Sequence, residues 1–540
     1  MKTIETLSWR NSAVRSQYLV TFCLRCFVFG FFFLWNAVET HSQIMAPARI
    51  EFNSRIDVPV YDTQVLGEKG LLYFYETSET TDDGRRKWFF ALYDTAFHEQ
   101  WQQNVSVSDG YQLKMAKTEG SVAFFLFLSQ GRNKRTEGFE VVRFDCDSNS
   151  FRLYGSTLPE KTTFAGFAAL NNAVLLGINL PRNQADILLF DLQTHELRSL
   201  GHGLSGQIII QSVAANPQRN EWMVGIKRFE SGKYIEDVFQ VYSASGNLLQ
   251  SHSYSALPNF LHSYSITFDA DGALVAVGSY DDEWTKRNAA NATAEAEDWN
   301  FQSKGLFYLA FDTDQAKVAQ FHPFGKFSNI YQAVSTDDLM RLRQKQSRNH
   351  RAQNPKGLYF QFFNPRLIKT ADAIVFAGDA FKKQYRTETR MSYDFYGRLI
   401  PYTYTVFEGY NFFTGLYACF DKEGNLRWSS DLSLGETLLP YLKDITLAQA
   451  DDDDFLTAFL RDGVLSYKVL DSSGKTIGQQ EQHRVEPLFA NDRLLEEEFS
   501  TIVHWYGPYF LLTGYQKITN IKLRADNVRQ VFYMQKMAFE

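Results

Sequence analysis

The segment Ala418-Cys-Phe-Asp-Lys-Glu-Gly-Asn-Leu-Arg-Trp428 contains an apolar run, an Asp, a short polar turn and a second strand-like run. Asp accepts hydrogen bonds from the amides of its own turn and Gly tolerates a positive φ, so this order of residues is typical of a tight β-hairpin. The order occurs six more times along the chain. Its first turn position is then Asp94, Asp145, Asp191, Ser243, Asp312 or Asp471.

The spacing of these turns indicates a structural repeat. Four of the six spacings lie near 50 residues. A second hairpin precedes each of these turns, as in Ser265-Ile-Thr-Phe268 followed by Ala273-Leu-Val-Ala-Val277. Each repeat therefore contains four antiparallel strands, and four strands in about 40–50 residues are the signature of a β-propeller blade.

Counting predicts the architecture. Seven repeats are complete, and an eighth, with strands at Thr501–His504, Tyr509–Thr513 and Gln530–Met534, ends one strand short. The segment Arg49–Ile56 has no partner in the first repeat, so we expect it to supply the missing strand and close the ring. The fold class is therefore all-β, a propeller of eight four-stranded blades, with seven blades as the alternative. A sandwich or a two-domain all-β fold leaves the extra strand unexplained.

On the segment Phe420–Trp428, and over most of 49–540, the chain resembles bacterial secreted β-propellers of the broad quinoprotein-like and WD-repeat-like superfamily. The resemblance implies a propeller fold, and a fold does not determine a function. No residues of a quinone site carry over, and no Trp-Asp dipeptide ends the repeats as in WD proteins.

The N-terminus is typical of a targeting segment. Four basic residues precede the apolar run Cys26–Val38, and Thr40 and Ser42 are suitably small for cleavage after Ser42. We expect residues 1–42 to be a signal peptide and 43–540 to be a single propeller domain, exported to the periplasm or cell surface of a bacterium. An uncleaved anchor that starts near Tyr18 is the alternative. No later segment is apolar enough to span a membrane.

Composition narrows the possible partners. The chain has 55 Lys+Arg against 62 Asp+Glu, a formal net charge of −7, which argues against a nucleic-acid partner. Only Cys146 and Cys419 remain after residue 42. They lie in different repeats, so we expect no disulfide between them and a place in the core for Cys419.

Three insertions, 281–303, 326–357 and 381–412, are predicted on the same side of the propeller, and long loops on a rigid scaffold often carry function. The segment 326–357 is basic, with a short helix expected after Ser335. The segment 381–412 is rich in Tyr and Arg, which are favoured at binding surfaces. Its candidate binding residues are Tyr385, Arg386, Arg390, Tyr393, Tyr396, Arg398, Tyr402 and Tyr404. The alternative is an extended hairpin whose rings pack on its own blade.

No catalytic residue, metal site or cofactor site is predicted. A metalloprotease motif and an EF-hand loop are both missing from the sequence, and Asp451–Asp454 is interpreted as a solvated turn. Asp394 and Glu408 are the best candidates for a glycosidase pair. The favoured function is a non-enzymatic exported protein, a monomer or a subunit of a complex, that binds a protein or a glycan. A carbohydrate-active envelope enzyme and an architectural envelope subunit are the alternatives.

Overall fold

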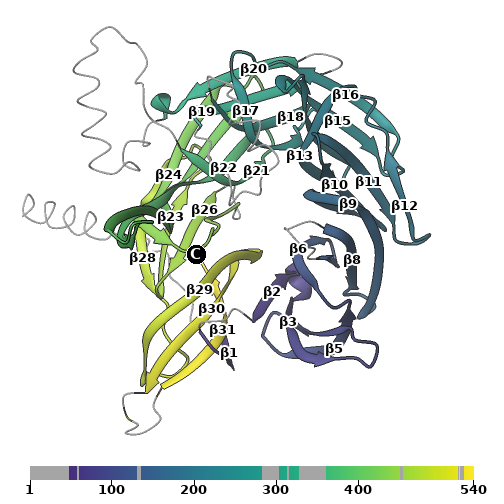
Figure 1. Ribbon diagram of the computed structural model, residues 1–540. Coiled ribbons are helices and arrows are strands. Elements are labelled where there is room, and N and C mark those ends of the chain that lie inside the picture. The colour runs from purple at the N-terminus through teal and green to yellow at the C-terminus, as the bar shows by residue number, and fades with distance from the viewer. Residues whose placement is uncertain are drawn as a thin grey trace, which may run out of the picture. The chain divides into compact units, whose positions relative to one another are not determined.

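The computed structural model describes residues 48–56, 60–129, 136–281, 303–312, 316–327, 360–449, 454–520, 522 and 528–539. The described residues up to Met537 belong to one compact unit. The described chain is almost entirely β (Figure 1), and its only helical segments are the 3-10 turns η1 (Gly67–Lys69) and η3 (Phe324–Lys326). The predicted signal peptide, the helix after Ser335 and nearly all of 281–303, 326–357 and Asp451–Asp454 lie outside the described residues.

The strands form seven sheets, and every neighbouring pair is antiparallel. The first four-stranded sheet contains β2 (Tyr61–Val65), β3 (Leu71–Thr80), β4 (Arg86–Tyr93) and β5 (Glu99–Val107). The seven-stranded sheet contains β6 (Tyr111–Glu119), β7 (Val122–Ser129), β8 (Thr136–Asp145), β9 (Ser150–Leu170), β10 (Ala173–Leu180), β11 (Gln184–Asp191) and β12 (Glu196–Leu200).

The remaining sheets have four strands each. Two of them contain β13 (Gln207–Asn216), β14 (Glu221–Glu230), β15 (Lys233–Ser243) and β16 (Leu248–Tyr254), and then β17 (Phe260–Phe268), β18 (Leu274–Asp281), β19 (Gly305–Phe311) and β20 (Ala316–Pro323). The next two contain β21 (Gln361–Lys369), β22 (Ala373–Tyr393), β23 (Leu399–Asp421) and β24 (Leu426–Leu439), and then β25 (Thr446–Gln449), β26 (Phe455–Arg461), β27 (Val464–Leu470) and β28 (Thr476–Arg484). The last contains β29 (Asp492–Tyr506), β30 (Tyr509–Asn520), β31 (Val528–Ala538) and β1 (Arg49–Asn53).

The seven-stranded sheet arises because the long strand β9 pairs with two different strands along its length. Its first part pairs with β8, from Ser150 to Thr162, and its second part pairs with β10, from Thr163 to Leu170. The predicted order of four consecutive antiparallel strands is thus confirmed, and two such sets share one long strand.

The predicted turn chemistry is also confirmed. In the turn that follows β23, the carboxylate of Asp421 accepts a hydrogen bond of 2.7 Å from the amide of Asn425, and Gly424 has a φ of 74°. In the turn that follows β27, Asp471 accepts from the amides of Ser473 and Lys475, both at 2.9 Å. Asp at the first position therefore sets these hairpins by bonding to its own backbone.

Neighbouring sheets share apolar cores. One cluster joins the sheets of β17–β20 and β21–β24 through Tyr308, Phe324 and Phe376, all fully buried. Another joins the sheets of β21–β24 and β25–β28, where Tyr417 and Phe459 are buried. A third packs Trp505 of the last sheet among residues of the first sheet. The core is therefore a series of inter-sheet layers.

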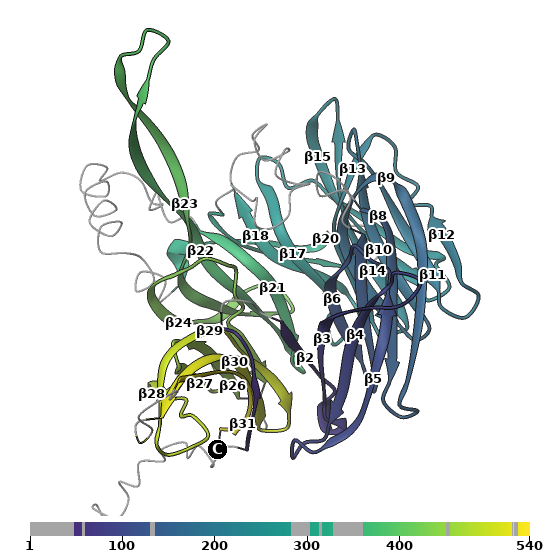
Figure 2. The same cartoon turned by 60° about the horizontal axis from the view of Figure 1, so that its bottom comes forward.

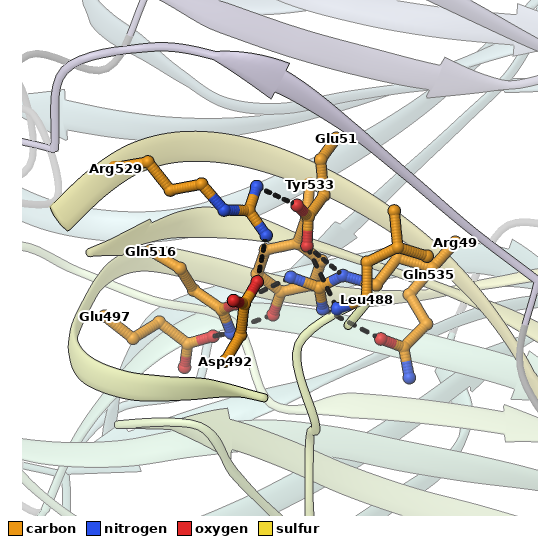
Figure 3. A network of polar contacts seen from close by, with 9 residues as sticks. All are labelled: Arg49, Glu51, Leu488, Asp492, Glu497, Gln516, Arg529, Tyr533 and Gln535. Atoms are coloured by element: carbon orange, nitrogen blue, oxygen red, sulfur yellow. Dashed lines mark hydrogen bonds and ion pairs between the residues drawn. The ribbon is translucent and has the colours of Figure 1, made fainter. Parts of the chain in front are cut away.

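The first described strand pairs with the last one. β1 runs antiparallel to β31 from Arg49 opposite Gln535 to Asn53 opposite Val531. The side chain of Arg49 is only 2% exposed and lies over the ring of Tyr533, 4.2 Å from its centroid. Its guanidinium donates to Gln535 at 3.0 Å and to Gln516 at 2.6 Å (Figure 3). The predicted pairing of this N-terminal segment with the final repeat is confirmed.

A carboxylate network completes this join (Figure 3). Glu51 of β1 accepts from the guanidinium of Arg49 at 2.8 Å and forms an ion pair with Arg529 of β31. Arg529 also donates to Asp492 of β29 at 2.5 Å. Glu497 of β29 accepts at 2.8 Å from the hydroxyl of Tyr533. Because buried charges need partners, this network stabilises only the arrangement in which β1 is in place.

Cys146 and Cys419 are both free, as predicted, and both are buried. Cys419 lies in β23, opposite Trp428 of β24, in the core that was expected for it. Burial raises the pKa of its thiol to about 12.

Candidate functional site

The candidate site is the hairpin of β22 and β23, which continues far past the other strands of its sheet (Figure 2). β22 pairs with β21 up to Phe381, and β23 pairs with β24 up to Tyr410. Beyond those residues β22 and β23 pair only with each other, as far as Tyr393 opposite Leu399. We call residues 384–409 the ribbon; its strands extend roughly 30 Å at about 3.4 Å per residue.

The root of the ribbon is anchored in the core. Phe381, Tyr410 and Phe412 are buried and pack on one another, with ring centroids of Phe381 5.6 Å from Tyr410 and 5.8 Å from Phe412. Gly409 has a φ of 148°, and a Cβ at this position would collide with the carbonyl oxygen of Leu439. Gly is therefore required at position 409, at the root of the ribbon in β23, because the end of β24 lies directly against this position.

One face of the ribbon carries alternating charges and two Tyr rings. The register places Arg386, Glu388 and Arg390 along β22, with Tyr404 opposite Glu388 and Tyr402 opposite Arg390. Glu388 forms an ion pair with Arg386 at 2.6 Å and accepts a hydrogen bond from the Tyr404 hydroxyl at 2.5 Å. The Arg390 guanidinium carbon lies 5.1 Å from the Tyr404 ring centroid, and the two Tyr rings stack at 6.0 Å.

These contacts pre-organise that face, which we call the Tyr–Arg face (Arg386, Glu388, Arg390, Tyr402 and Tyr404). The hydroxyl of Tyr404, followed by Arg386, lowers the pKa of Glu388, so its carboxylate stays ionised and continues to hold both Arg side chains. The side chains of Arg386 and Arg390 are still 57% and 75% exposed, so their donors remain accessible to a partner.

The opposite face carries apolar side chains and uncharged polar ones. Tyr385 packs edge-on against Phe407, with ring centroids 5.5 Å apart, and Thr389 lies 3.2 Å from Thr403 through their hydroxyls. Farther out, Met391 lies opposite Pro401 and Tyr393 lies opposite Leu399. Phe407 packs on the buried Tyr410 with ring centroids 5.1 Å apart, whereas Met391, Tyr393 and Leu399 farther out are all exposed.

The ribbon ends in the turn Asp394-Phe-Tyr-Gly-Arg398. Asp394 accepts hydrogen bonds from the amides of Tyr396 at 2.9 Å and Arg398 at 2.8 Å, and Gly397 has a φ of 74°. The side chain of Phe395 is 97% exposed and that of Tyr396 76%. Two aromatic residues thus occupy the most solvated positions of the turn.

Exposed apolar groups are concentrated here. Among the described residues, nine of the twenty exposed large hydrophobic side chains belong to the ribbon: Tyr385, Met391, Tyr393, Phe395, Tyr396, Leu399, Ile400, Tyr402 and Phe407. Single exposed hydrophobic residues are ordinary on protein surfaces, but a cluster of this size is unusual.

The structure places all eight predicted binding residues on the ribbon. Four of them, Arg386, Arg390, Tyr402 and Tyr404, share the Tyr–Arg face, whereas Tyr385 and Tyr393 lie on the opposite face. Tyr396 and Arg398 belong to the turn, where the Arg398 guanidinium carbon lies 5.5 Å from the Tyr396 ring centroid. The extended hairpin is confirmed as the form of this segment, but its outer rings stand in solvent and do not pack on their own sheet.

Sequence reasoning missed Phe395, the most exposed ring. The available signal was its turn, because Asp-x-x-Gly leaves both central side chains in water and aromatic residues are unexpected there. Sequence reasoning also suggested Asp394 and Glu408 as a carboxylate pair, and this is wrong. Asp394 lies in the turn and Glu408 beside Gln384 at the root, roughly 30 Å away, whereas glycosidases need about 5–10 Å.

A second concentration of titratable groups is enclosed between the sheets of β13–β16 and β17–β20. Lys227 donates to Asp237 at 2.8 Å, and Tyr264 donates to the same carboxylate at 3.2 Å. The Lys227 and Asp237 side chains are 1% and 0% exposed. Burial, followed by the charge of Asp237, raises the pKa of Tyr264. This cluster contacts only the protein interior, so it stabilises the interface between two sheets and offers no site to a substrate.

The described part of the chain holds no group of three or more His, Cys, Asp or Glu side chains placed to bind a metal ion. No helix in it is long and apolar enough to cross a membrane.

No protein-family model and no curated protein matches this chain. Several solved structures are similar in fold. The β-propeller domain of the Trilobed protease from Pyrococcus furiosus is 10% identical, with a TM-score of 0.34 over 79% of this chain and 93% of that one. The polysaccharide lyase Uly1 is 9% identical, with a TM-score of 0.39 over 79% and 89%. A eukaryotic initiation factor is 12% identical, with a TM-score of 0.39 over 89% and 92%. Because all three TM-scores lie below 0.5, these likenesses carry no inference about ligand or reaction.

Proposed function

We propose that this protein is an exported eight-bladed β-propeller that works as a non-enzymatic binding protein, and that its ribbon engages a protein partner. The blade count follows if β9 is divided between two blades and β29–β31 with β1 form the eighth. The shared core between the first and last sheets supports a closed ring. Export follows from the expected signal peptide at 1–42, with the periplasm or cell surface of a bacterium as the destination.

The observation that carries the proposal is the concentration of exposed apolar side chains on the ribbon. A solvated two-stranded ribbon gains little stability from such groups, because apolar side chains stabilise a fold only when they are buried. Their burial in a complex is the simplest physical reason for them. The binding energy would come from Tyr and Arg anchors, which dominate most protein interfaces.

The composition favours a protein over a glycan partner. Below the apex of the ribbon (Met391–Pro401), the exposed rings of Tyr385 and Phe407 pack on each other, and aromatic surface of this kind matches the apolar centre of a protein interface. The Tyr–Arg face alone also suits a sugar with carboxylate groups, because Arg grips carboxylates through two parallel hydrogen bonds. The glycan alternative therefore makes a distinct prediction, namely retention on anionic polysaccharides.

Photo-crosslinking tests the proposal. Tyr402 is replaced by benzoylphenylalanine in the full chain, and the protein is irradiated with extracts of the cells that produce it. Ile477 of β28, which is 47% exposed on another sheet, is the matched control position. We expect a discrete protein adduct from position 402 and none from position 477.

A parallel assay separates the alternatives. The full chain is applied to neutral and anionic polysaccharides, and retention and new reducing ends are scored together. New reducing ends would contradict the non-enzymatic proposal, and retention without a protein adduct would show that the partner is a glycan. If the chain assembles into an envelope complex equally well without the ribbon, the architectural alternative is correct.

A further inference from the structure

The apex of the ribbon, Met391–Pro401, differs from the rest of the molecule in its exposed chemistry. We propose that this apex inserts into the headgroup layer of a lipid membrane that contains anionic lipids. This goes beyond the proposed function, and it rests on that function only in treating the ribbon as a binding element. Arg386, Glu388, Tyr402 and Tyr404 of the Tyr–Arg face stay available to a protein partner.

A comparison of turns provides the first argument. Asp394-Phe-Tyr-Gly-Arg398 and Asp421-Lys-Glu-Gly-Asn425 share the Asp and Gly positions, and in both the Asp carboxylate accepts from the amide four residues later. A third turn of this kind, Asp471-Ser-Ser-Gly-Lys475, also has polar central residues. Turn geometry therefore does not require aromatic residues at the central positions. Only the turn at the end of the ribbon exposes Phe and Tyr there.

Second, exposed apolar side chains lie on both faces and at the end of the apex. Met391 with Pro401 and Tyr393 with Leu399 lie on one face, and Ile400 lies on the other face opposite Ser392. Phe395 and Tyr396 cover the end. Lipid surrounds whatever enters it, so apolar side chains on both faces and at the end match the headgroup layer of a membrane.

Third, backbone amides of the apex turn are hydrogen-bonded within the turn. Polar backbone groups must be satisfied internally before they can leave water for a membrane. At the apex, the amides of Asp394 and Gly397 donate to Arg398 and Asp394 carbonyls, both at 2.9 Å. The amides of Tyr396 and Arg398 donate to the Asp394 carboxylate. The turn therefore satisfies these amides itself. The outer edges of both strands, including those of 391–393 and 399–401, have no further strand beside them in the described chain, which limits insertion to the headgroup layer.

Charge provides the fourth argument. Residues 382–410 contain five Lys and Arg and three Asp and Glu, a net charge of +2 in a chain of net charge −7. Arg390 directly precedes the apex and Arg398 lies within its turn, and their side chains are 75% and 76% exposed. Exposed Arg next to Tyr and Phe is the arrangement found at membrane–water interfaces, where the cations meet lipid phosphates and the rings lie among the headgroups.

Hydrogen exchange with vesicles tests the inference on the full chain. Vesicles of phosphatidylcholine are compared with vesicles that also contain phosphatidylglycerol, and exchange is followed in peptides that cover 391–401. The local readout separates the apex from any lipid contact of the apolar run Cys26–Val38. We expect slower exchange at 391–401 with the anionic vesicles, and no change in the turn at Asp421–Asn425.

The matched variant is F395K/Y396E, which copies the Lys-Glu pair of the turn at Asp421 and leaves the net charge unchanged. We expect it to fold normally and to lose vesicle-dependent protection at 391–401. We expect its vesicle affinity at this site to fall by about tenfold or more, because burial of one Phe is worth more than the 1.4 kcal/mol that corresponds to a factor of ten. R390Q/R398Q should lose the preference for anionic vesicles by roughly tenfold.

Three results would overturn the inference. One is unchanged exchange at 391–401 with both kinds of vesicle. Another is a F395K/Y396E variant that is protected as well as the original chain. The third is a dimer in solution that F395K/Y396E abolishes, which would show that the apex binds a second copy. A protein adduct at position 402 without vesicle protection would leave the proposed function intact and contradict the lipid inference alone.

Discussion

The inner and outer halves of β22 and β23 belong to the same two strands, but they differ in what surrounds them. The inner half, from Ala373 to Phe381 in β22, is a continuous buried run flanked by β21 and β24. The outer half pairs only with itself, and its side chains are mostly exposed. Burial in the fold therefore explains the apolar residues of the inner half, but it does not explain the aromatic residues of the outer half.

The largest expected effect contrasts one residue type in the two halves. Phe381→Ala leaves a cavity in the inter-sheet core, and we expect it to lower the free energy of unfolding by about 3–5 kcal/mol. Phe395→Ala removes a ring that is 97% exposed and should change that free energy by about 0.5 kcal/mol or less. Urea unfolding of both variants measures the contrast. Equal losses would show that the apex is part of the folded core.

A buried lysine in the core also predicts that stability depends on pH. Lys443, which follows β24, lies buried near Phe459 and donates to Ser500 at 3.1 Å. Burial lowers the pKa of Lys443 from 10.5 to about 8. Between these two values the unfolded chain binds a proton that the folded chain does not, so stability rises with pH across this window and is lost as the pH falls through it.

The expected size of this contribution is about 3 kcal/mol between pH 8 and 10.5. Lys443→Met should remove it, so the difference in unfolding free energy between the two proteins should vary with pH across the window. This subtraction cancels the tyrosines that titrate in the same range. A difference that stays constant with pH would show that Lys443 keeps its ordinary pKa.

A substitution at the boundary between the inner and outer halves is expected to have a smaller effect on stability. Gly409→Ala places a Cβ against the carbonyl oxygen of Leu439 at a φ of 148°, and we expect a loss of roughly 1–3 kcal/mol in thermal unfolding. Gly397→Ala, at a φ of 74° with open space around it, is the control and should cost about 1 kcal/mol or less. If both substitutions cost the same, the end of β24 does not define the start of the ribbon.

The smallest expected effect is a change in one pKa on the Tyr–Arg face. Tyr404→Phe removes the hydroxyl that bonds to Glu388, and we expect the pKa of that carboxyl to rise toward its ordinary value. NMR titration of the Glu side-chain carbons measures it, with Tyr402→Phe on the same face as the control. An unchanged titration of Glu388 would mean that this face is not pre-organised.

Much of the fold could be predicted from the sequence because local turn chemistry marks each hairpin. Asp94, Asp421 and Asp471 all occupy the predicted first turn positions, and the unpaired segment at Arg49 pairs with β31. The continuity of β9 could not be predicted, because it depends on neighbouring sheets that share one strand.

The candidate site was predicted by composition but not by geometry. Tyr and Arg content identified the segment, whereas the division into two faces depends on the strand register and on the bulge between Gln384 and Tyr385, which shifts every later residue. The Asp-x-x-Gly pattern indicates that Phe395 is exposed, but the distance of this turn from the other strands of its sheet depends on the length of the β22–β23 hairpin, which the local pattern does not give.

Removal of the ribbon tests the central claim most directly. Residues 384–409 are replaced by Asn-Gly, a pair that suits a two-residue hairpin turn between Lys383 and Tyr410. We predict that the free energy of unfolding changes by about 1 kcal/mol or less, while capture of the protein that crosslinks to position 402 is lost. A variant that fails to fold, or one that still captures this partner, would contradict the assignment of the ribbon to binding and not to the fold.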